Sequence, residues 1–136
     1  MTAPRSDVLD SLVRVSFTVM ALLSQVASAH DLSLTQLRVL AILRDREPKM
    51  AELADYLGQD RSSVSGLIDR AARRGLVRRA ASGDDGRSVR VGLTPEGQRL
   101  ASVLADEIGA LIAPMTAHLG PADQKRLGAY LGALLD

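Results

Sequence analysis

The sequence contains no cysteine, tryptophan or asparagine, and only three of its 136 residues are aromatic. Without cysteine the chain has no disulfide, thiol redox switch or cysteine metal site, and two isolated histidines do not make a histidine-rich metal site. We therefore expect no metal ion and no cofactor.

The motifs of common enzyme classes are also missing. There is no G-x-G-x-x-G segment, phosphate-binding loop, G-x-S-x-G or H-E-x-x-H motif, and the carboxylates show no pairing suited to general acid–base chemistry. We expect that the protein is not an enzyme, and no catalytic residue is assigned.

Long uninterrupted apolar runs are absent as well. Polar residues break the apolar stretches well short of the roughly twenty residues needed to cross a bilayer, and no small-residue cleavage site follows a cationic start. With 46% apolar and 24% charged residues, the chain can still bury a core. These features predict a soluble globular protein of one domain, or at most two small interlocked ones, in the cytoplasm and without a membrane partner.

The net charge of +1 conceals an uneven distribution. Residues 61–90 hold eight arginines and three aspartates, a local charge of about +5, whereas the rest of the chain carries about −4. A basic segment in a nearly neutral protein indicates a localised surface for phosphate, although a merely solvated face has the same composition.

Long apolar helices are expected at both ends of the chain. Over residues 7–30 apolar side chains recur at alternating spacings of four and three, which places them on one side of a helix. A second pattern follows Pro95, with Pro114 expected to kink or end it, and a last helix starts at residues 120–121. These helices carry more apolar surface than a small fold can cover, so we expect them to pack together in a homodimer interface. The predicted interface residues are Val8, Leu12, Val15, Val19, Leu22, Leu127, Leu131 and Leu134.

Residues 50–71 contain two short helical patterns joined by a tight turn. Gly58 supplies the left-handed conformation that closes the first helix, and Asp60 is the predicted N-cap of the second. A preceding helix is expected from about Leu34 to Arg44, behind the cap Ser33. The two helical patterns within residues 50–71 therefore predict a helix-turn-helix. The expected buried side chains are Leu53, Ala54, Leu57, Val64, Leu67, Ile68 and Ala71.

The second helix of this pair presents short and basic side chains outward when its apolar stripe faces inward. Short side chains let the backbone approach a DNA major groove, hydroxyls can bond base edges or phosphates, and a helix N-terminus favours phosphate. The pattern is typical of a recognition helix, about Arg61 to Arg74, although exposed serines also occur on an ordinary solvated helix. Asp69 is expected to pair with Arg73, four residues on. The predicted DNA-binding residues of this helix are Arg61, Ser62, Ser63, Ser65, Gly66, Arg70 and Arg73.

A hairpin is predicted directly behind the recognition helix. The stretches LVRRAAS and VRVGLT flank a Gly-Asp-Asp-Gly turn and have the composition of short strands. Such an appendage is a wing, and Arg87 near its tip is predicted to enter a narrow minor groove. For Arg78, Arg79 and Arg90 along the strands, the alternatives are phosphate contact and solubility of the sheet edge.

Three segments in this order resemble the MarR family of bacterial transcription factors, from about Val8 to the C-terminus: LTQLRVLAIL, AELADYLGQDRSSVSGLIDRAARRGLV and DDGRSVRVGLTPEG. The resemblance implies a mainly α fold with a small β-hairpin wing. Residues 33–94 would form a winged helix-turn-helix DNA-binding region, and residues 1–32 with 95–136 a helical dimerisation region. Asp85 corresponds to the aspartate of the family's wing motif, and Arg87 to the arginine that reaches the minor groove.

The resemblance also implies a homodimer that binds a roughly palindromic operator and most often acts as a repressor. Many members of the family bind small anions, frequently aromatic or phenolic, and then release the DNA. The absence of cysteine excludes the peroxide-sensing branch, and the absence of asparagine leaves base reading to Arg, Ser or Gln. Gln59 occupies a turn position that is usually apolar. Phe17, Tyr56 and Tyr130 give little support for a pocket that stacks an aromatic ligand. His30 either takes part in ligand or pH sensing or is a helix-terminal histidine that meets free carbonyls.

The predicted partners are double-stranded DNA, a second copy of the chain and a small-molecule effector. The predicted function is that of a sequence-specific DNA-binding transcriptional regulator. The protein would be a homodimeric repressor that binds a palindromic operator, and the effector would relieve the repression. The alternative is a winged-helix module for protein contact without specific DNA binding, because a fold does not determine a function.

Overall fold

The computed structural model describes residues 4–81 and 88–136, with side chains from Asp7 onward. The described elements are α1 (Pro4–Ala29), α2 (Leu34–Leu43), α3 (Met50–Leu57), α4 (Arg61–Arg73), β1 (Val77–Ala81), β2 (Val89–Leu93), α5 (Pro95–Thr116) and α6 (Pro121–Leu134). β1 and β2 pair antiparallel, with Val77 opposite Leu93. The predicted fold class, mainly helical with one small hairpin, is confirmed.

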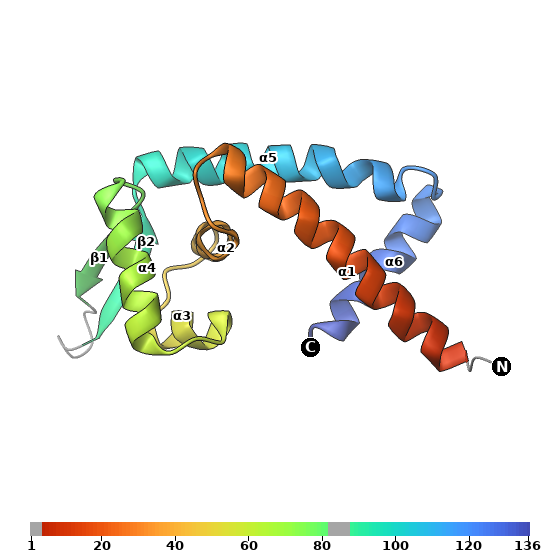
Figure 1. Ribbon diagram of the computed structural model, residues 1–136, viewed down its shortest axis with the longest axis horizontal. Coiled ribbons are helices and arrows are strands. Elements are labelled where there is room, and N and C mark those ends of the chain that lie inside the picture. The colour runs from red at the N-terminus through yellow and green to blue at the C-terminus, as the bar shows by residue number, and fades with distance from the viewer. Residues whose placement is uncertain (1–3, 82–87) are drawn as a thin grey trace.

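The elements are arranged along α5. Figure 1 shows α2, α3, α4 and the hairpin gathered near the N-terminal end of α5, and α6 at its other end. α1 packs against α5 and diverges from it toward the N-terminus (Figure 1). Pro114 does not end α5, which continues to Thr116 before the chain turns by 115° into α6.

Local signals place the helix ends where the sequence predicts them. The Ser33 hydroxyl accepts a hydrogen bond from the backbone N–H of Gln36, whose side chain accepts one from the Ser33 N–H, so the two form a capping box. Gly58 ends α3 in the left-handed conformation, with φ +65°. Asp60 caps α4. These three predictions are confirmed.

The hydrophobic core lies at the end of the molecule that holds the short helices. Its largest fully buried side chains are Leu53, Val64, Ile68 and Val91. All seven predicted buried residues of α3 and α4 are buried. By contrast, among the side chains of α1 that the structure describes, those of Val26 and Ala27 are buried, and α6 has no buried residue. The core therefore supports the helix-turn-helix and leaves the outer helices largely uncovered.

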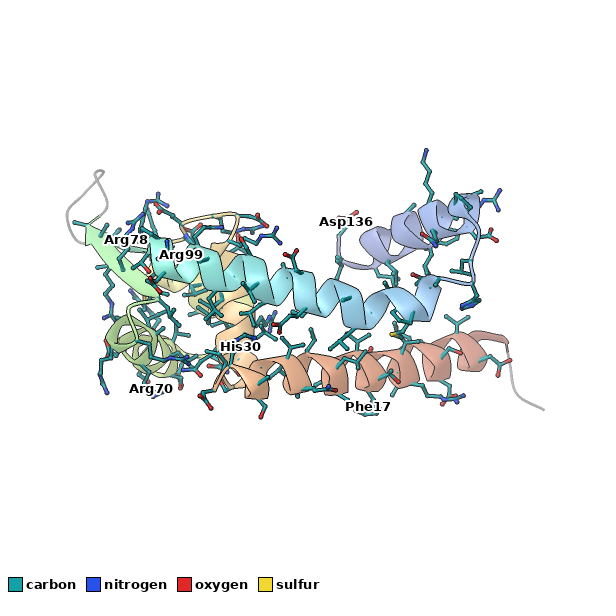
Figure 2. All side chains as sticks on the ribbon, turned by 90° about the horizontal axis from the view of Figure 1, so that it is seen from above. Phe17, His30, Arg70, Arg78, Arg99 and Asp136 are labelled. Atoms are coloured by element: carbon teal, nitrogen blue, oxygen red, sulfur yellow. The ribbon has the colours of Figure 1, made fainter. Side chains whose placement is uncertain are left out.

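The uncovered parts of α1 and α6 expose many large apolar side chains. Figure 2 shows Phe17 on the side of α1 turned away from α5, and its exposed fraction is 68%. The exposed set on the two helices is Val8, Leu9, Leu12, Val13, Val15, Phe17, Met20, Tyr130, Leu131 and Leu134.

By length and composition alone, residues 7–29 of α1 could cross a membrane, with a mean hydropathy of 1.5 and 11% of the window buried. So could α5 and α6 together, if their bent pair is taken as one span. The sequence prediction considered uninterrupted apolar runs, whereas the polar residues that interrupt α1 are mostly Ser and Thr, which lower its mean hydropathy little. A helix that packs against protein passes the same test.

Candidate nucleic-acid interface

The outward side of α4 gathers the predicted recognition residues. The buried stripe of α4 anchors one side of the helix in the core, so the residues opposite that stripe face away from the core. Ser65 and Gly66 are half-buried, and the other five are exposed. The members of this set, which we call the α4 face, are Arg61, Ser62, Ser63, Ser65, Gly66, Arg70 and Arg73.

The α4 face begins at a charged cap. The backbone N–H of Ser63 and the hydroxyl of Ser62 donate to the same Asp60 oxygen, at 2.8 and 2.9 Å. These hydrogen bonds, that of the Ser63 N–H first, lower the pKa of the Asp60 carboxyl below its usual value. The Ser62 hydroxyl therefore donates its hydrogen bond to the Asp60 carboxylate, and its lone pairs are left to accept one from a ligand.

The cap predicts a pH dependence of stability. A carboxyl with a lowered folded-state pKa stabilises the fold above its unfolded pKa of about 4, and this contribution is lost as the pH falls through the folded value. Asn caps a helix as well as Asp but does not titrate. We expect the melting temperature of the wild type to exceed that of Asp60→Asn near neutral pH and the difference to shrink below about pH 4. Thermal unfolding across this range measures it, and a difference independent of pH would contradict the assignment.

The arginines of the α4 face and those of the two strands form two sets. Arg61, Arg70 and Arg73 on α4 form no ion pair with any residue that the structure describes. By contrast, Arg78 pairs with the Glu47 carboxylate, and Arg90 donates to the Glu47 carbonyl at 2.9 Å. The first set is open to a ligand anion, while the second is held by the protein itself.

Arg79 is also held, and its partner corrects a prediction. Its Nη1 donates to Asp69 at 2.6 Å, and its Nη2 lies 3.3 Å from the Ser65 carbonyl oxygen. The expected pairing of Asp69 with Arg73 is therefore wrong, because the hairpin brings a second guanidinium to the same carboxylate. Each strand arginine has a partner within the chain. The two alternatives predicted from the sequence, phosphate contact and solubility of the sheet edge, did not include such a partner.

Two grooves flank α4. One lies between α4 and the hairpin, has a volume of about 570 Å³ and is lined by Met50, Arg61, Ser62, Ser65, Asp69, Arg79 and Val89. The other, of about 350 Å³, lies toward the start of α2 and is lined by Ser33, Thr35, Gln59, Ser62, Ser63, Gly66, Leu67 and Arg70. The helix is thus a polar ridge between two depressions, a shape suited to insertion into a groove of DNA.

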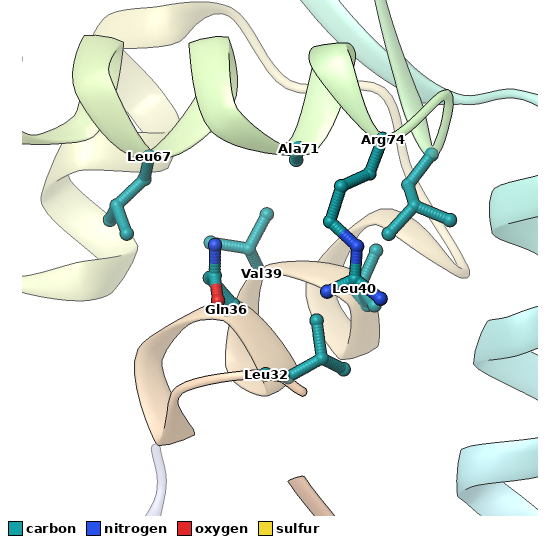
Figure 3. Close-up of a pocket in the computed structure, with 8 residues that line it drawn as sticks. Leu32, Gln36, Val39, Leu40, Leu67, Ala71 and Arg74 are labelled. Carbon is teal, nitrogen blue, oxygen red and sulfur yellow. The ribbon is translucent and has the colours of Figure 1, made fainter. Parts of the chain in front are cut away.

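Two further hollows adjoin α2. Figure 3 shows the one between α2 and α4, where Gln36 and Arg74 stand among aliphatic side chains. It measures about 10 Å³, the space of about one water molecule. The other, between α2 and α5, is open and measures about 320 Å³; its rim carries Arg44 and Asp45. Of these two, only the second has room for an organic ligand.

His30 and Arg74 join the end of α1 to its neighbours. His30 Nε2 lies 2.9 Å from a Glu107 oxygen on α5 (Figure 2 shows His30 at the end of α1). The alternative in which the ring meets helix-terminal carbonyls is wrong, because the ring lies on Glu107. Arg74 instead donates to the carbonyls of His30 and Asp31, at 3.1 and 2.9 Å. Sequence reasoning gave Arg74 no role, and no local pattern could have shown a contact across more than forty residues.

The remaining predicted site residues, Asp85 and Arg87 of the wing motif, lie outside the described residues. The hairpin that carries them is confirmed on both sides of that segment.

Comparison with known proteins identifies the family. A helix-turn-helix followed by a two-stranded hairpin defines a winged-helix protein. A sequence model of the MarR family matches residues 30–88. The HTH-type transcriptional regulator PecS of Dickeya dadantii is 32% identical over 104 residues, which cover 74% of this chain and 63% of that protein. The chain belongs to the MarR family of transcriptional regulators.

Solved structures agree with this fold. The crystal structure of a MarR-family regulator from Silicibacter pomeroyi has 30% identity and a TM-score of 0.78, over 91% of this chain and 84% of that one. NadR in complex with 4-hydroxyphenylacetate has a TM-score of 0.81, over 98% and 96% of the two chains, and its 21% identity supports the fold alone. The chain spans 44% and 63% of the lengths of two curated regulators that it matches.

Proposed function

We propose that the protein is a sequence-specific DNA-binding transcriptional regulator that acts in the cytoplasm as a homodimeric repressor of a palindromic operator. The observation that carries the proposal is the α4 face, where three arginines without an intramolecular ion pair among the described residues surround short side chains. Each α4 enters a major groove, and Arg87 enters the adjacent minor groove. Two-fold symmetry then requires half-sites about one helical turn, roughly 10 bp, apart.

The exposed surface of the single chain supports dimerisation. A compact monomer of 14.5 kDa exposes about 6,900 Å², whereas this chain exposes 9145 Å², an excess of about 2,200 Å². An excess of this size is more than the roughly 800 Å² that each partner buries in a standard interface. In the proposal residues 1–32 and 95–136 form the dimerisation region, and residues 33–94 form the DNA-binding region.

A small-molecule effector is the third proposed partner, held in the hollow between α2 and α5. Its walls are aliphatic and contain no aromatic ring, and Arg44 at the rim can pair with an anion. NadR shows that a protein of this fold can bind 4-hydroxyphenylacetate. For this chain we propose that an effector selects a dimer geometry in which the two α4 helices no longer match the operator grooves.

The first test is affinity for the DNA upstream of the protein's own gene, against a scrambled duplex of equal length, at several salt concentrations. Preference for the true duplex, with affinity falling steeply as salt rises, supports the regulator. If the protein binds the true and the scrambled duplex equally weakly, the next experiment is selection of bound sequences from random DNA. Failure to enrich any sequence would overturn specific DNA binding and favour the protein-contact alternative.

The α4 face predicts the effect of removing Arg73. Because its guanidinium has no ion-pair partner among the described residues, we expect Arg73→Ala to weaken binding about tenfold on every duplex and to reduce the salt slope by about 2 per dimer. Titrations of wild type and variant at matched salt measure both effects. The control is Arg126→Ala, which removes the same charge from α6; an equal loss in the control would show a general charge effect.

A further inference from the structure

The hairpin is tied to α4 by one cluster of polar contacts. Arg79 on β1 donates to Asp69 at 2.6 Å and lies within 3.4 Å of both oxygens of Ser65, all on α4. Among the described residues, these are the side-chain hydrogen bonds between the two elements. Only Val77 of β1 is buried, so the rest of that strand has no packed apolar side chain to hold it in place.

The other strand, β2, is held to the segment before α3. The Val91 N–H donates to the carbonyl of Pro48 at 3.0 Å, and Lys49 forms a β-bridge with Arg90. The Glu47 carboxylate, paired with Arg78, lies over Gly92, where an added Cβ would come within 2.5 Å of it. Both strands are therefore held to the segment before α3, β1 through Arg78 and β2 through its backbone. Beyond the buried Val77, the side-chain contact of β1 with α4 among the described residues is that of Arg79.

The Asp69–Arg79 ion pair lies in an exposed position, so a contribution to stability does not explain why it is there. The side chains of Asp69 and Arg79 are 46% and 35% exposed, and ion pairs in such solvated positions add little to stability. Both side chains line the groove between α4 and the hairpin, beside Arg61 and Ser62. A carboxylate there repels the phosphates of an approaching duplex. An acidic residue at this place must therefore have another effect.

We propose, building on the DNA-binding function above, that Asp69 and Arg79 form a positioning clamp that determines specificity. The clamp holds the hairpin at one angle to the recognition helix, so that α4 and the wing can occupy neighbouring grooves of one duplex together. Arg79 acts through the geometry of the hairpin and adds no net charge toward phosphates, since Asp69 neutralises it.

The variant Asp69→Asn separates this inference from simple electrostatics. Removing a negative charge from the DNA-facing surface should tighten binding if charge alone matters. With the clamp, we expect affinity for the duplex enriched from random DNA by the wild type to fall about tenfold, while affinity for a scrambled duplex stays equal or rises. The matched control is Asp55→Asn, an exposed aspartate on α3, which makes the same charge change outside this cluster. Tighter binding of Asp69→Asn to the enriched duplex would overturn the clamp.

A second measurement needs no DNA. Amide hydrogen exchange of β1 should be about fivefold faster in Asp69→Asn and in Arg79→Ala than in the wild type, with the amides of α3 unchanged. The swapped pair Asp69→Arg with Arg79→Asp keeps the net charge and should restore part of the protection. Unchanged exchange in both single variants would overturn the clamp. If the wild type enriches no sequence, the proposed function fails, and exchange still decides whether the clamp exists.

Discussion

An aspartate in place of Val15 is expected to weaken dimerisation about 1,000-fold and to abolish operator binding at concentrations that saturate the wild type. Val15 belongs to the apolar side of α1 and is 48% exposed in the single chain. It borders a hollow of about 260 Å³ between α1 and the end of α5, shared with Met115, into which a partner's side chain can fit. The substitution therefore affects a contact between chains more than the fold of one chain.

The magnitude follows from symmetry. A carboxylate forced into an apolar contact costs about 2 kcal/mol or more, and a two-fold interface contains the change twice. About 4 kcal/mol corresponds to roughly a 1,000-fold change in the dimer dissociation constant. A monomer then places one recognition helix on DNA without the second half-site, so the advantage of bivalent binding is lost.

Sedimentation velocity over a concentration series measures the dimer, and circular dichroism checks that α1 remains helical. The control is Ala21→Asp, which adds the same charge at an exposed position of α1 on the same face as Arg14, about two turns along the helix. We expect the control to sediment as the wild type does. An unchanged dimer in Val15→Asp would contradict the assignment of this side of α1 to the interface.

The helix-turn-helix could be predicted from sequence because its signals are local. The burial of Val64 and Ile68 follows from helical periodicity, and the roles of Gly58 and Asp60 follow from the conformation and hydrogen bonding of single residues at helix ends. Each of these signals lies within about four residues of the feature that it predicts. The two grooves beside α4 could not be read in this way, because they depend on how the helix packs against the hairpin and α2.

The polar partners of the site were the least predictable part. The i,i+4 rule favours Arg73 as the partner of Asp69, but that rule applies to an isolated helix. In the folded chain Arg79 reaches the same carboxylate across a turn, and its rigid fork also approaches the Ser65 backbone. The contact between His30 and Glu107 joins residues 77 positions apart. Such pairs depend on the packing of distant elements, on which single-sequence patterns carry no information.

A second large effect is expected from Gly97→Ala, which should lower the stability of the fold by about 3 kcal/mol and its melting temperature by roughly 10 °C. Gly97 is buried in the first turn of α5, where its N–H donates to the cap residue Thr94 at 3.0 Å. A Cβ at this position would lie 1.9 Å from the backbone carbonyl oxygen of Leu76 and 2.9 Å from its carbonyl carbon. Backbone atoms cannot move aside as the end of a flexible side chain can, so α5 must shift away from the base of the hairpin.

Helix propensity alone predicts the opposite sign. Alanine in a helix interior is more favourable than glycine by about 1 kcal/mol, so without the close contact the substitution should stabilise α5. Gly109 supplies the matched control, because it lies in the same helix and a Cβ there would meet nothing within 4 Å. We expect Gly109→Ala to raise the melting temperature slightly and Gly97→Ala to lower it strongly, at equal protein concentration. Equal stabilisation of both variants would mean that the start of α5 does not depend on its approach to Leu76, and that the hairpin and the long helices are joined in another way.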